Sequence, residues 1–150
     1  MKPFAICVLG VGVCLTGSAA ETKVTMEQLP PAVQSAIKEQ AAGATILGAS
    51  KEREHGHMTY EVETKKDGKG RDLTFDEKGS LLEVEQELDL DSVPGPVRQA
   101  IQKRVAGGTV KKVESVTQGS TTSYEADVRT KDGKSREVAV NADGSPHKGD

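Results

Sequence analysis

The chain contains one segment twice, and this internal repeat constrains its fold more than any other feature. Residues 29–45 and 93–109, aligned at an offset of 64, are identical at seven of 17 positions. Residues 67–80 and 132–145, aligned at an offset of 65, are identical at six of 14 positions. Such self-similarity indicates one supersecondary unit that occurs twice. We therefore expect two tandem copies of one fold, over residues 21–88 and 89–150.

Each copy begins with a helix signal. Pro31 and Pro96 suit the first turn of a helix, where a missing N–H costs nothing. Gly43 and Gly107 suit the C-terminal cap. The positions expected to face a core follow at helical spacing: Val33, Ala36, Ile37 and Gln40 in the first copy, and Val97, Ala100, Ile101 and Val105 in the second. Helices of about three turns are unstable alone, so each must pack on a sheet.

After each helix the hydrophobic period changes to two. Tyr60, Val62 and Thr64 alternate with charged residues, which is typical of a half-buried strand. Asp67-Gly68 and the matching Asp132-Gly133 predict tight hairpin turns. Earlier strands are expected near residues 45–53 and 109–117, and we expect the second copy to lack its fourth strand. The sequence thus predicts an α+β fold of two tandem α-β-β-β(-β) repeats, each a helix packed on an antiparallel sheet; the two sheets could form one.

The first 20 residues have the order of a secretory signal peptide. Lys2 is followed by an apolar run from Phe4 to Leu15, and then by small residues that end at Ala20. A membrane-spanning helix would need about 20 apolar residues, and this run is shorter. We expect export to the periplasm or the medium, with no stable membrane insertion after cleavage.

Composition excludes several classes of function. Cys7 and Cys14 both lie in the predicted leader, so the mature chain would have no disulfide, zinc–thiolate site or cysteine nucleophile. The net charge is −3, with the two signs interspersed. This charge pattern contains no basic patch of the kind that binds nucleic acid or an anionic membrane. The oligomeric state is left open.

The repeated residues resemble the PepSY-like domain of the β-lactamase-inhibitor-like family. In the first copy the resemblance rests on Leu29-Pro30, Ala32-Val33, Ala36-Ile37, Gly43-Ala44, Tyr60-Glu61-Val62, Leu73-Thr74-Phe75-Asp76 and Gly79. In the second it rests on Val93-Pro94, Val97, Ala100-Ile101, Gly107, Tyr124-Glu125 and Val138 to Gly144. The second copy departs from it at Ala126 and at Val140-Asn141. The resemblance implies an exported domain that binds or restrains a protein, with no catalytic residues to carry over.

The residues themselves give little sign of enzymatic chemistry. There is no Gly-x-Ser-x-Gly elbow and no phosphate-cradling glycine loop, and we predict neither catalysis nor a cofactor. His55 and His57 flank a glycine and could share a metal ion. An exposed turn is the simpler interpretation, since the second copy has Gln118-Gly119-Ser120 there.

The alternation of the strands predicts a helix-free sheet face that is rich in acidic residues. We expect it to bind an unidentified protein or peptide, with a small-ligand or metal site at the His55/His57 turn as the alternative function. The residues proposed for partner binding are Glu61, Glu63, Asp72, Thr74, Asp76, Glu83, Glu125 and Asp127.

The leader predicts the first measurable outcome. Because Ser18 and Ala20 are the small residues that signal peptidase requires, cleavage should follow Ala20. Mass spectrometry of the exported protein should find Glu21 at its N-terminus. Recovery of an intact Met1 terminus from the membrane fraction would contradict this prediction.

Overall fold

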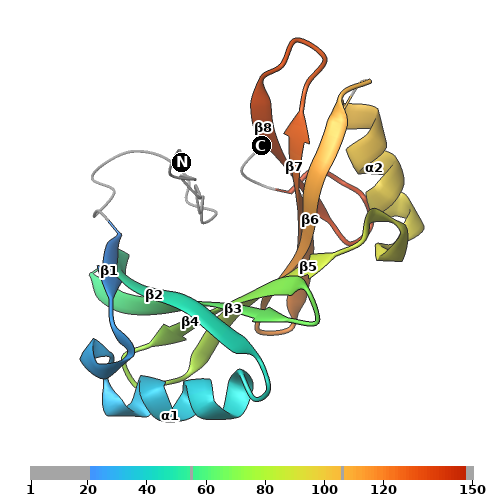
Figure 1. Cartoon of the computed structure of the whole chain (residues 1–150). Helices are drawn as coiled ribbons and strands as arrows, with labels where there is room; N and C mark the ends of the chain where they lie inside the picture. Colours follow the sequence, from blue (N-terminus) through green and yellow to red (C-terminus); the bar gives the residue numbers. More distant parts are fainter. Residues whose placement is uncertain (1–20, 55, 106, 148–150) are drawn as a thin grey trace.

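The computed structural model describes residues 21–54, 56–105 and 107–147; the predicted leader lies outside them. The chain forms one antiparallel sheet of eight strands whose order follows the sequence, together with two α-helices (Figure 1). This confirms the α+β class and shows one continuous sheet. The elements are β1 (Thr22–Val24), α1 (Pro31–Gln40), β2 (Thr45–Glu54), β3 (His57–Lys66), β4 (Lys69–Asp76), β5 (Leu81–Leu88), α2 (Gly95–Val105), β6 (Thr109–Gln118), β7 (Thr121–Arg129) and β8 (Ser135–Asn141).

Strand β5 belongs to both copies of the repeat. It pairs with β4 through residues 81–86 and with β6 through residues 83–88. Gln86, Glu87 and Leu88 pair with β6 at positions that, at an offset of 64, match the pairs that β1 makes with β2. β5 is therefore both the last strand of the first copy and the leading strand of the second. The boundary at residues 88 and 89 stays a prediction, since one strand serves both units.

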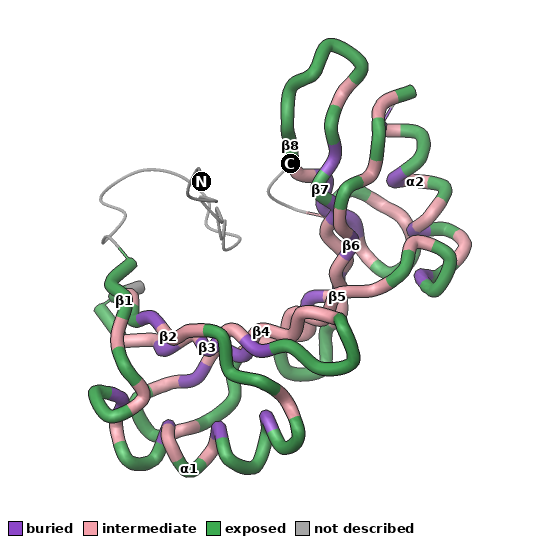
Figure 2. Tube along the Cα trace, viewed as in Figure 1, coloured by how far each residue is buried: buried purple, intermediate pink, exposed green. Residues whose placement is uncertain are grey.

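Both helices cover the same face of the sheet. Val84 and Leu88 alternate with acidic residues on β5, and they pack beside the cores under α1 and α2 respectively. The buried residues gather where each helix meets its strands (Figure 2). The first core contains Leu29, Val33, Ile37, Ala41, Tyr60, Val62, Leu73 and Phe75, and the second contains Val93, Val97, Ile101, Val105, Val113, Ala126, Val128, Val138 and Val140.

An arginine closes the C-terminal end of each helix. Arg71 on β4 donates from Nη1 to the Gln40 carbonyl oxygen at 2.7 Å. Arg136 on β8 donates from Nη2 to the Arg104 carbonyl oxygen at 2.6 Å. The last carbonyls of a helix have no partner within it, and a cation there also favours the helix dipole. The repeat therefore preserves a helix-to-strand bond as well as a core.

A glycine turn fixes the other end of each helix against the sheet. Gly79 and Gly144 both have a positive φ, of 81° and 82°. A Cβ at Gly79 would lie 2.6 Å from the Ala32 carbonyl oxygen, and a Cβ at Gly144 would lie 2.6 Å from that of Pro96. The turn thus needs glycine both for its backbone conformation and for the close approach of the helix.

Two details differ between the copies or from expectation. Gln40 was predicted on the buried stripe of α1 but is exposed, and Ala41, at the cap, is buried instead. Among the described residues the second copy has three strands after its helix, where the first copy has four. Pro146 pairs with Val140 in an isolated bridge, at the place where Leu81 pairs with Phe75 in the first copy.

No helix in the described ranges is long and apolar enough to cross a membrane.

The two helix cores predict matched losses of stability. Ile37 is 1% exposed and Ile101 is 0% exposed. Replacing either with Ala removes buried methyl groups and leaves a cavity, so the free energy of unfolding should fall by about 2–5 kcal/mol. The exposed Lys38→Ala change should alter it by less than about 0.5 kcal/mol. Urea unfolding monitored by circular dichroism measures all three, and equal effects at the three positions would refute the helix phase.

Candidate functional site

The helix-free face of the sheet lies on the inner side of a pronounced bend (Figure 1). Strand register brings carboxylates side by side across this face: Glu63 lies opposite Asp72, Asp72 opposite Glu85, and Glu114 opposite Glu125. We call this surface the acidic face. Its carboxylates are Glu61, Glu63, Asp72, Glu83, Glu85, Glu87, Glu114, Glu125, Asp127 and Glu137.

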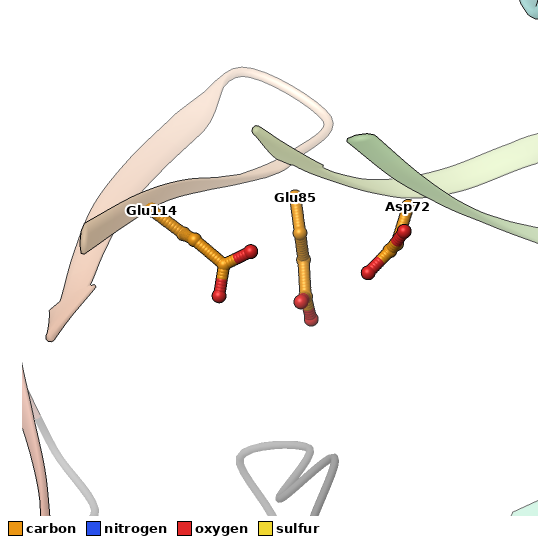
Figure 3. Close-up of side chains that lie close together, drawn as sticks. All are labelled: Asp72, Glu85 and Glu114. Carbon is orange, nitrogen blue, oxygen red and sulfur yellow. The ribbon is translucent and has the colours of Figure 1, made fainter. Parts of the chain in front are cut away.

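Three of these carboxylates meet at the bend. Asp72 on β4, Glu85 on β5 and Glu114 on β6 each place a carboxylate oxygen within 4.8 Å of the others (Figure 3). All three side chains are half-buried, although no helix covers them. The surface is also closed beside them, since Val116, which lies opposite both Glu85 and Ser123, is 5% exposed.

One lysine accompanies this group. Lys112 Nζ lies 2.6 Å from Glu114 Oε1, and Lys112 also lies opposite Asp127 in the register. Burial lowers the pKa of Lys112, but the bond to Glu114 and the charges of Asp72 and Glu85 outweigh it, so the pKa is raised. Lys112 therefore stays positively charged and neutralises the charge of Glu114.

Burial and like charges make the acidic face hard to ionise. Desolvation, followed by the charge of Glu83, raises the pKa of Glu85 to about 8. Desolvation, followed by the charge of Asp72, raises the pKa of Glu61 to about 7. The same causes, with Glu137 as the first neighbour, raise the pKa of Glu125 to about 7. Near neutral pH these side chains are only partly ionised.

Asp72 lies between opposing influences. Burial raises its pKa most, Lys112 lowers it, and Glu114 raises it again, which leaves the pKa at about 6. This carboxyl group therefore ionises before that of Glu85 as the pH increases.

The register places the proposed partner-binding residues on this face, but they are not equivalent. Thr74 lies between Glu61 and Glu83, and Glu83 accepts a hydrogen bond from Gln118 Nε2. Asp127 is exposed, whereas the others on the face are half-buried. Asp76 has a separate role, because its Oδ1 accepts hydrogen bonds from the backbone N–H groups of Lys78 and Ser80 at 2.8 Å each. These bonds lower its pKa and hold the turn between β4 and β5.

The sequence reasoning did not single out Glu114 and Lys112. The register of β6 shifts between Val110 and Lys112, which breaks the alternation that would have assigned them to this face. Val116 interrupts the alternation of polar and apolar residues along β6 as well, since it is a buried apolar residue on the acidic side. The sequence feature that could have identified Glu114 is its position as an acidic residue within the β-branched run of residues 109–117.

The histidine turn has a different setting. His57 is exposed at the start of β3, and His55 lies outside the described residues. Within the described part of the chain, the close group of possible cation ligands is made of carboxylates and includes no histidine. Carboxylates gather on acidic surfaces without a metal, and we assign no metal site here.

Comparisons with known proteins agree with this fold. The structure is similar to a DUF2874 family protein from Bacteroides uniformis, with a TM-score of 0.65 and 19% identity over 79% of this chain and 86% of that one. It is similar to a protein from Bacteroides eggerthii described as a "putative periplasmic" one, with a TM-score of 0.62 and 19% identity over 80% and 86% of the two chains. It is also similar to a BLIP-like protein from Bacteroides fragilis. The TM-score is 0.59 and the identity is 22%, over 81% of this chain and 86% of that one.

A comparison with family models assigns both copies of the repeat. No curated protein matches the chain at a significant level. One family model, described as "Putative beta-lactamase-inhibitor-like, PepSY-like", matches residues 17–83 and again residues 67–144. The two matches overlap at residues 67–83, which contain β4 and the start of β5, the strand that pairs with strands of both copies. The chain therefore belongs to the PepSY-like, β-lactamase-inhibitor-like family.

Proposed function

We propose that the protein is an exported, noncatalytic module that binds a protein partner by receiving a basic segment on its acidic face. The observation that carries this proposal is the row of half-buried carboxylates that continues from β3 to β8 across both copies of the repeat. Export is supported by the predicted leader and by the similarity to a protein described as periplasmic.

The electrostatics of the free face favour a basic partner. Glu61, Glu85 and Glu125 have raised pKa values because burial and like charges oppose their ionisation. Lysine or arginine side chains of a partner would offset these effects and lower the pKa values, since an opposite charge stabilises the carboxylate form. Binding at neutral pH would then release protons from the face. The charges should also increase the rate of association and select against acidic partners.

The arrangement gives less support to a catalytic role or to the alternative function. Carboxylate pairs can act as acid and base, but the carboxylates of the acidic face form a continuous row from β3 to β8. Membership of the β-lactamase-inhibitor-like family supports a role in restraining a protein rather than in catalysis. No observation on the described residues favours a small-ligand or metal site at His57.

Charge reversal on the acidic face tests the proposal. The probe is the mature chain, immobilised and exposed first to a lysine-rich peptide and a glutamate-rich peptide of equal length, and then to periplasmic extract. Changing Glu61, Glu63 and Asp72 to Lys should weaken capture of the lysine-rich peptide at least about tenfold, because attraction becomes repulsion. Capture by the wild type should also weaken as salt rises through about 0.15 M.

A matched control separates this face from net charge. Glu27, Glu39 and Glu77 are exposed carboxylates outside the acidic face, so their change to Lys alters the formal net charge by the same amount. This control should keep most of the capture. If both triple variants lose capture equally, or if the reversed face still captures the same extract proteins at the same salt, the binding surface lies elsewhere.

A further inference from the structure

The two repeats have separate apolar cores and meet where β5 pairs with β6. Each has its own apolar core, and the two cores share no residue. Val84 on β5 packs on the first core, and Leu88, four residues later, packs on the second. The visible bend of the sheet lies where β5 meets β6 (Figure 1).

Between these two anchors the junction is polar on both faces except at Val116, which is buried opposite Glu85 on the acidic side. On the helix side, Gln86 lies opposite Ser115, and Val84 lies opposite Thr117. On the acidic side, Glu87 lies opposite Glu114. In the described residues, the β5–β6 backbone ladder therefore crosses the junction without an apolar cluster that would fix the angle between the repeats. Regions with few buried apolar contacts are the ones that move most easily in a folded protein.

A like-charged group occupies the inner side of this junction. Asp72, Glu85 and Glu114 come from three adjacent strands and lie within 4.8 Å of one another (Figure 3). Each strand near Glu85 on this face contributes charged side chains to its surroundings. The groups are Glu61 and Glu63 from β3, Asp72 from β4, Glu83 and Glu87 from β5, Lys112 and Glu114 from β6, and Glu125 from β7.

We propose that the bend between the two repeats is a pH-responsive hinge, which opens when the carboxylates at the β4–β5–β6 junction repel one another and closes when Asp72 and Glu85 take up protons. Repulsion on the inner side of a bend pushes the two arms apart, and protonated carboxyl groups instead hydrogen-bond to their neighbours. The acidic face would then change its shape together with its charge. This inference does not depend on the proposed function.

The titration of the group lies in an accessible range. Burial is the main cause that raises the pKa of Glu85 to about 8 and that of Asp72 to about 6. Below this range both groups are neutral, and above it both are ionised. Because the folded-state pKa values lie above the ordinary ones, these groups contribute fully to stability below their ordinary pKa values, and the contribution is lost as the pH rises from there to the folded-state values of about 6 and about 8. Lys112 stays charged throughout, since its pKa is raised from an already high value.

The distance between the two arms tests the hinge directly. The mature chain is predicted to contain no cysteine, so Lys51→Cys on β2 and Lys131→Cys in the β7–β8 turn give two unique spin-label positions, both exposed. Electron–electron double resonance, in buffer with a chelator, compares the label distance at about pH 5.5 and about pH 9. The mean distance should be longer at the higher pH, with the change centred between the pKa values of about 6 and about 8.

Neutral variants identify the cause of the change. Glu85→Gln should remain near the short distance at both pH values and lose at least half of the shift, and Asp72→Asn should also reduce it. Glu39→Gln, on the exposed face of α1, should keep the full shift. Far-ultraviolet circular dichroism verifies the fold at each pH. A label distance that is constant over this range overturns the inference, and so does a full shift retained in both junction variants.

Discussion

The pairing of β5 with β6 is the interaction on which the rest of the structure depends. Six consecutive residue pairs, from Glu83 with Gln118 to Leu88 with Val113, join two units that otherwise have separate cores. Because β5 also pairs with β4, this single strand joins the strands of both copies into one sheet and places both helices on one side. Without it, each copy would have an open sheet edge and a small core, which is marginal for a domain of this size.

This shared strand also produces the acidic face. Once both helices lie on one side, every polar position of the alternating strands faces the other, and the register places carboxylates next to carboxylates. The resulting pKa shifts of Glu61, Asp72, Glu85 and Glu125 show that the folded protein keeps these groups at a cost in stability near neutral pH. Local rules of sequence design are most often broken at functional sites, which is a physical reason to look for function here.

The two copies show which parts of the unit are required. The helix stop, the arginine that binds the end of the helix and the glycine turn recur in both, and each satisfies a backbone requirement that few other residues could meet. Core volume is freer, since Phe75 and Leu73 in the first copy correspond to valines in the second. Cores tolerate changes in apolar side chains more readily than turns tolerate the loss of a glycine.

The sequence by itself determined the local structure of this protein: the repeat, the two helices begun by proline, the Asp-Gly turns and the alternation that leaves one acidic sheet face. These features follow from backbone geometry and from hydrophobic periods of two and 3.6 residues. Both are local properties of the sequence and do not depend on contacts between distant segments. The tertiary structure alone decided that β5 serves both copies, and that Glu114 and Lys112 join Asp72 and Glu85 at the bend. Register across strands and the bulge in β6 set those contacts, and neither depends on residues that are close in sequence.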